Sequence, residues 1–136
     1  MRALRWGLLL PCSLLAGYLA YLIGGTVNRF TTMMFAGPPP SWPSWLAVST
    51  DVMAHMYIGL AATYVAVRIA PAHHKTVAAA ICGLSLLLAG ASIFAAVLTG
   101  KFASIISTGG LMFGSIVLTV GVFRDEIDVG FKSDKV

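Results

Sequence analysis

The chain has 136 residues, of which 58% are hydrophobic and 10% are charged, and its formal net charge is +4. A soluble domain contains roughly 25% charged residues, so this composition excludes a water-soluble globular protein. It also excludes a disordered chain, because disorder requires low hydrophobicity and high charge. The basic residues lie singly at the ends of apolar segments. They form no face for a phosphate backbone, so we expect no nucleic-acid partner.

Four apolar stretches are long enough to cross a bilayer, whose hydrocarbon core of roughly 30 Å requires about 20 helical residues. They predict spans at about 6–27, 46–70, 76–100 and 102–123. The first is retained, because a cleaved signal peptide has an apolar core of only ~7 to 15 residues. We therefore predict an all-α membrane protein, in which residues 1–136 form a single four-helix antiparallel transmembrane bundle.

Residues 28–45 are predicted to form a loop on the outer side of the membrane. Four prolines prevent a continuous helix there and favour extended polyproline geometry: Pro38, Pro39, Pro40 and Pro43. Trp42 and Trp45, like Trp6 at the start of the first span, are amphipathic rings that settle at the level of the lipid head groups. Two interpretations remain open: the loop returns the chain to the membrane, or it presents Phe35 and the two tryptophans to a partner.

The second span contains Asp51, the only acid inside a predicted span, and His55, the only histidine inside one. Such a group near the bilayer centre carries a penalty of roughly 2.5 to 3.5 kcal/mol, so it usually faces the bundle or a water-filled cavity. The two residues are four apart and share one helical face, where the carboxylate can orient the imidazole as a proton acceptor. With Asn28 and Arg29 at the outer end of the first span, they form a candidate polar or ion path.

A second interpretation of Asp51 remains open. The run Ser49-Thr50-Asp51 directly before an apolar segment is typical of a helix N-cap. A helix that begins at Val52 still spans the bilayer, and Asp51 then lies at the outer surface. In that case His55 lies one turn below the surface and forms a hydrogen bond with Tyr57, Asn28 or a backbone carbonyl.

The third and fourth spans are uncharged and rich in small residues, through which helices associate closely in lipid. The residues that we assign to helix packing are Ala79, Gly83 and Gly90 in the third span and Gly110, Gly114 and Gly121 in the fourth. Gly110 and Gly114 form a GxxxG motif. We expect it to pack within the chain, and a homo-oligomer formed through the fourth helix is the alternative.

The distribution of Lys and Arg predicts the orientation, because the side of the membrane with the excess stays in the cytoplasm. One side carries Arg2, Arg5, Arg68, Lys75, Arg124, Lys132 and Lys135, and the other carries Arg29 and Lys101. Both termini are therefore predicted to be cytoplasmic (N-in/C-in), and residues 124–136 form a cytoplasmic tail. Arg68 and Arg124 act as interface anchors at this side.

Signatures of catalysis are absent from the sequence, which contains no GxSxG, HExxH or Walker motif. No metal-ligand spacing is present either, so we expect no enzyme, metal site or cofactor. The leading hypothesis is a non-enzymatic accessory subunit or self-associating scaffold in the inner cell membrane, with the lipid bilayer and a homo-oligomer or larger membrane complex as partners. The alternative is a small oligomeric proton- or ion-coupled transporter or channel that uses Asp51 and His55.

Overall fold

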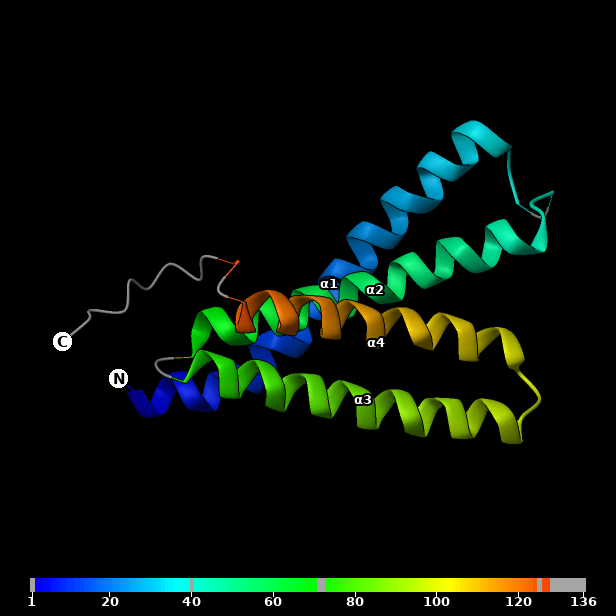
Figure 1. Cartoon of the computed structure of the whole chain (residues 1–136). Helices are drawn as coiled ribbons and strands as arrows, with labels where there is room; N and C mark the ends of the chain where they lie inside the picture. The colour runs from blue at the N-terminus through cyan, green and yellow to red at the C-terminus, as the bar shows by residue number, and fades with distance from the viewer. Residues whose placement is uncertain (1, 40, 71–72, 125, 128–136) are drawn as a thin grey trace.

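The computed structural model describes residues 2–39, 41–70, 73–124 and 126–127, and these contain four helices and no strand. The helices are α1 (Arg2–Ala36), α2 (Ser44–Ile69), α3 (His74–Leu98) and α4 (Phe102–Phe123) (Figure 1). Each is long and apolar enough to cross a membrane. The predicted all-α class with four membrane-length helices is therefore confirmed. Residues 125 and 128–136 of the predicted tail lie outside the described residues.

The first helix is longer than the apolar pattern predicted, because residues 28–36 are helical and do not belong to the loop. This segment contains neither glycine nor proline, so nothing ends the helix before Gly37. Gly37 has a left-handed backbone (φ 78°), and its N–H donates to the carbonyl of Met33 (3.0 Å), which is a common way to close a helix. The connection between α1 and α2 is thus limited to residues 37–43.

The second helix begins at Ser44, directly after Pro43, so the N-cap interpretation of Asp51 is wrong. Proline is well tolerated just before a helix, and no residue between Ser44 and Asp51 interrupts the helical backbone. The Thr50 hydroxyl donates backwards to the carbonyl of Leu46 (2.8 Å) and does not cap a helix N-terminus. Asp51 therefore lies two turns inside α2, about 10 Å from the helix start.

The second helix is the centre of the molecule, since it contacts all three other helices, whereas the α1 backbone approaches that of α2 only. On one side, Gly17 of α1 lies against Ile58 of α2. On the other side, Gly110 and Gly114 of α4 lie against the backbone of Val52 and Met56. From the pair Gly110–Val52 to the pair Gly114–Met56 the residue number rises in both helices, so α2 and α4 run in the same direction. This close parallel contact differs from a bundle in which only antiparallel neighbours touch.

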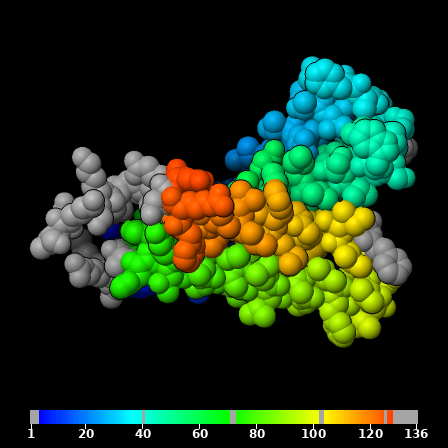
Figure 2. All heavy atoms as spheres, in the orientation of Figure 1, coloured from blue at the N-terminus to red at the C-terminus, as the bar shows by residue number. Residues whose placement is uncertain are grey.

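The C-terminal part of α1 diverges from α3 and α4 (Figure 1). At about 1.5 Å per residue, the 35 residues of α1 extend about 52 Å, well beyond the roughly 30 Å of a hydrocarbon core. The space-filling view shows the end of α1 and the start of α2 as a lobe that rises from the body formed by α3 and α4 (Figure 2). This divergence creates the space in which the candidate site lies.

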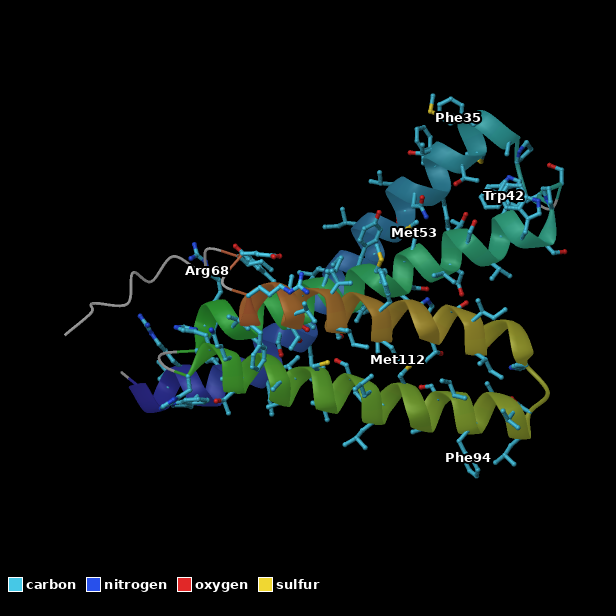
Figure 3. All side chains as sticks on the ribbon, in the orientation of Figure 1. Phe35, Trp42, Met53, Arg68, Phe94 and Met112 are labelled. Atoms are coloured by element: carbon cyan, nitrogen blue, oxygen red, sulfur yellow. The ribbon has the colours of Figure 1, made fainter. Side chains whose placement is uncertain are left out.

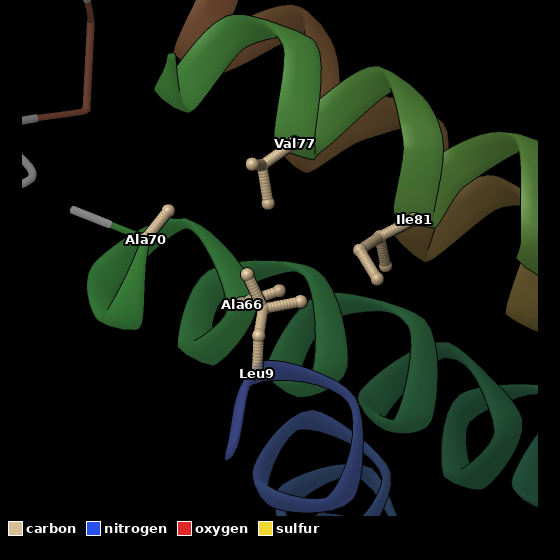
Figure 4. Close-up of a cluster of buried hydrophobic side chains, with 5 residues drawn as sticks. All are labelled: Leu9, Ala66, Ala70, Val77 and Ile81. Carbon is tan, nitrogen blue, oxygen red and sulfur yellow. The ribbon is translucent and has the colours of Figure 1, made fainter. Parts of the chain in front are cut away.

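The opposite end of the molecule is held together by a small apolar core (Figure 4). Its members come from the start of α1, the end of α2 and the start of α3: Leu9, Ala66, Ala70, Val77 and Ile81. The Lys75 ammonium donates to the carbonyl of Phe123 (3.2 Å), which brings the end of α4 to the same place. Arg68 lies at this end as well (Figure 3). The structure thus gathers a basic end of the molecule, opposite the lobe.

Candidate functional site

A cavity of about 800 Å³ opens where α1 diverges, and we call it the outer hollow because it lies at the end of the molecule that the sequence predicts to face outward. Its walls come from three helices and the connecting loop: Thr26, Arg29, Phe30 and Met33 of α1; Pro39 and Trp42; Ala47, Val48, Thr50 and Asp51 of α2; Ser104 and Ser107 of α4. Trp42 lies between the end of α1 and the start of α2 (Figure 3), and its indole N–H donates to the carbonyl of Gly37. The loop therefore closes the outer end of the hollow.

The two charged residues of the hollow lie side by side. A guanidinium nitrogen of Arg29 is 3.9 Å from a carboxylate oxygen of Asp51. The Asp51 side chain is 36% exposed and the Arg29 side chain is 62% exposed, so the pair is only partly shielded from its surroundings. Charge-assisted hydrogen bonds measure about 2.7–2.9 Å, so the pair attracts across a gap without a hydrogen bond.

His55 and Asn28 hold the helices around this ion pair. The His55 Nδ1 lies 2.8 Å from the backbone carbonyl of Asp51 and 3.8 Å from its carboxylate. A carbonyl can only accept, so the hydrogen bond requires the proton on Nδ1 and leaves Nε2 available. The His55 ring also meets the edge of Tyr21 in α1, with centroids 5.5 Å apart. Asn28 donates from Nδ2 to the carbonyl of Thr50 (3.2 Å) and so links α1 to α2.

The four residues predicted as a polar path are thus brought together by the structure at the seam between α1 and α2. The hollow also includes polar residues that sequence reasoning missed, namely Thr26 of α1 and Ser104 and Ser107 of α4. The serines lie three residues apart on one helical face, which is a visible signal. Nothing in the sequence, however, indicates that this face meets the hollow.

The glycines assigned to packing fall into two groups. The space beside Gly110 and Gly114 is occupied by α2, because a Cβ on either residue would overlap with the α2 backbone. A Cβ on Gly121 would similarly meet the side chain of Ile127 (2.7 Å). A methyl group on Gly83 or Gly90, in contrast, would have no neighbour within 4 Å among the described residues.

The predicted small-residue face of α3 is therefore open within this chain. Ala79 on the same side of the helix is exposed as well. Phe94 is 65% exposed and points away from the other helices (Figure 3). Only 17% of the apolar α3 segment is buried, the same share as in α1 and less than the 28% of α2 and the 39% of α4. The outer face of α3 is thus free to contact lipid or another helix.

The predicted interface anchors lie near the ends of the helices. Trp6 is 48% exposed on the first turns of α1, and Trp45 is 70% exposed on the first turn of α2. Arg124 pairs with Glu126 just beyond α4 (3.9 Å). The described residues contain no group of three or more His, Cys, Asp or Glu side chains that could bind a metal ion.

Comparison of the chain with known protein families, with curated proteins and with solved structures finds no match.

Proposed function

We propose that this protein is a non-enzymatic subunit of a membrane complex and that it docks against another transmembrane helix through α3. The observation that supports the proposal is the open small-residue face of Ala79, Gly83 and Gly90. Small residues let helix backbones approach closely in lipid, where apolar area alone gives no driving force for association. Close-approach glycines of the other helices, such as Gly17, Gly59 and Gly110, meet a neighbouring helix of the same chain, whereas Gly83 and Gly90 of α3 meet none among the described residues.

The orientation belongs to the same proposal. The basic end of the molecule, with Arg5, Arg68, Lys75 and Arg124, faces the cytoplasm of the inner membrane by the positive-inside rule. The lobe and the outer hollow then face the other side. Both termini are cytoplasmic in this orientation, and the small-residue face of α3, from Ala79 to Gly90, extends about 16 Å along the helix.

The test is the mass and composition of the particle extracted in a mild detergent, measured by native mass spectrometry. We expect the wild-type particle to contain a second subunit, and the double variant Gly83→Leu/Gly90→Leu to lose it while its helicity and thermal unfolding stay unchanged. Gly109→Leu is the matched control, because Gly109 also has open space around it but lies on α4. A monomeric wild type, or a double variant that keeps its partner, would overturn the proposal.

Gly110 and Gly114 are unsuitable for this test, although they form the GxxxG motif. Leucine at either position would collide with the α2 backbone, so a loss of assembly would only report a damaged fold.

A second candidate function is a proton- or ion-coupled carrier. The observation in its favour is the convergence of Arg29, Asp51 and His55 beside a cavity. It predicts that Asp51→Asn and His55→Ala each abolish flux in liposomes without lowering the yield of folded protein. Normal flux in both variants would eliminate this candidate.

A further inference from the structure

The outer hollow contains two charges that lack hydrogen bonds. Among the residues that the structure describes, the Arg29 guanidinium donates no hydrogen bond, and the Asp51 carboxylate accepts none. Arg29 carries five N–H donors in a planar fork, and a carboxylate has about four acceptor positions. Each group therefore has most of its hydrogen-bonding capacity free for a molecule that enters the hollow.

The depth of the hollow makes these free positions significant. Val52, next to Asp51, lies against Gly110 of α4, which is eight residues and thus about 12 Å from the start of that helix. The 22 residues of α4 extend about 33 Å, close to the thickness of a hydrocarbon core. The ion pair is therefore level with the outer part of the span, where unsatisfied charges are unfavourable.

The walls of the hollow are amphipathic. Thr26, Ser104 and Ser107 contribute hydroxyl groups, while Phe30 and Trp42 contribute aromatic surface. Its volume of about 800 Å³ falls within the range of about 300–1,000 Å³ that is typical of ligand sites. A molecule that fits these walls has a charged head and an apolar body.

The charges select the type of head group. A purely anionic head group pairs with Arg29 but meets repulsion from Asp51, and a purely cationic one meets the reverse. A zwitterion satisfies both residues when it enters between them. Arg29 binds phosphate through two parallel N–H bonds, and a primary ammonium donates up to three N–H bonds to Asp51 and the neighbouring hydroxyls.

A site for the apolar part of such a molecule lies next to the hollow, along the contact between α1 and α2. A second, shallow groove of about 530 Å³ lies deeper in the membrane, between α1, α2 and α4. Its lining is apolar and aromatic and includes Ile23, Gly24, Tyr57 and Tyr64. Ile23 lies three residues before Thr26 of the hollow and thus on the same side of α1, so we expect an acyl chain that leaves the hollow to follow this groove.

We propose that the outer hollow binds one phospholipid with a phosphoethanolamine head group, whose phosphate lies on Arg29 and whose ammonium lies on Asp51. The bound lipid fills the space between the diverging helices and inserts between the two loosely paired side chains. This inference is independent of the docking role of α3, because no residue of α3 lines the hollow.

The experiment is native mass spectrometry of the detergent-purified, delipidated chain with phosphatidylethanolamine, phosphatidylcholine or phosphatidylglycerol of identical acyl chains. We expect one phosphatidylethanolamine to stay bound, with at least tenfold weaker retention of the other two lipids. Arg29→Gln and Asp51→Asn should each remove this preference. Lys101→Gln removes an exposed positive charge from the α3–α4 turn outside the hollow and should leave the preference unchanged.

Each arm of the experiment has a result that would overturn the proposal. If phosphatidylglycerol is retained as well as phosphatidylethanolamine, only the phosphate is recognised, through Arg29. If phosphatidylcholine is retained equally well, the ammonium N–H groups are not recognised. Soluble glycerophosphoethanolamine that competes as well as the lipid shows a head-group site without a lipid. Arg29→Lys controls for misfolding of Arg29→Gln. It keeps the positive charge but loses the planar fork of the guanidinium, so it should bind phosphatidylethanolamine with intermediate strength.

The position of the lipid is checked independently by fluorescence. In the variant Trp6→Phe/Trp45→Phe, Trp42 is the single remaining tryptophan. Phosphatidylethanolamine with brominated chains should quench Trp42 more than brominated phosphatidylcholine does, and Asp51→Asn should equalise the two. Equal quenching before the substitution would place the lipid outside the hollow and contradict the proposal.

Discussion

Gly110 of α4 lies so close to the carbonyl of Val52 in α2 that a methyl group on its Cα would overlap with the carbonyl oxygen. Gly114 has the same relationship with Met56 one turn further along. On the α2 side, Gly59 is equally confined by the backbone of Leu111 and Ser115. Two parallel helices thus meet backbone to backbone, and this contact fixes how the pair α3–α4 lies relative to the pair α1–α2.

Gly110→Leu should therefore destabilise the fold by about 3 kcal/mol or more, because the obstacle is backbone that cannot move aside. Gly109→Ala is the control, since no neighbouring atom of the described residues lies within 4 Å of a Cβ at this position. It should be neutral or stabilising, because alanine favours a helix by up to about 1 kcal/mol over glycine. Unfolding in denaturing detergent, followed by circular dichroism, measures both. A Gly110→Leu variant as stable as the wild type would show that α2 and α4 do not touch in this way.

Thr63 of α2 should tolerate replacement by valine, because its buried hydroxyl has no hydrogen-bond partner among the described residues. An unsatisfied buried hydroxyl carries a penalty of about 1–3 kcal/mol, so Thr63→Val should be neutral or stabilising. Thr119→Val provides the contrast. Its hydroxyl donates to the carbonyl of Ser115 (2.8 Å) and lies 3.4 Å from that of Ala78, so its loss should destabilise by about 0.6 kcal/mol. The reverse order of stability in the same unfolding assay would refute this assignment.

Gly37 should resist substitution by residues that carry a side chain, because its φ of 78° lies in the left-handed region. Gly37→Ala should destabilise the end of α1 by about 1–2 kcal/mol. Gly37→Asn should have a smaller effect, since asparagine tolerates this conformation better. Hydrogen exchange at the last turn of α1 measures the difference. Equal protection in the two variants would mean that α1 does not end at this residue.

Lys75 should contribute modestly to the basic end of the molecule through its hydrogen bond to the last carbonyl of α4. A cation at a helix C-terminus stabilises by about 0.3–1 kcal/mol, so Lys75→Met should lower stability by that amount and mainly at low salt. Lys75→Arg should retain most of the effect. A salt-independent loss in Lys75→Met would instead indicate lost packing of the lysine stem.

The candidate site was only partly predictable from the sequence. The spacing of Asp51 and His55 and the placement of Asn28 and Arg29 at the same end indicated that these residues meet, because helical periodicity and alternating spans determine this directly. The sequence left two interpretations of Asp51 open, because a polar triplet resembles an N-cap whether or not the preceding residues are also helical, and the helix start at Ser44 decides against the cap. Ser104 and Ser107 line the hollow because of the direction in which α4 crosses α2, and the periodicity of the sequence does not predict this direction.

The sequence alone determines that the chain has four membrane-length helices, because composition and the length of apolar runs reflect the thickness of the bilayer and not the arrangement of the helices. It also determines that close glycine contacts are available. Only the tertiary structure decides which of them are used: Gly110 and Gly114 meet α2, whereas Gly83 and Gly90 stay open. The divergence of α1 and the hollow beside Arg29 and Asp51 are decided there as well, because they depend on crossing angles set by side chains from different helices.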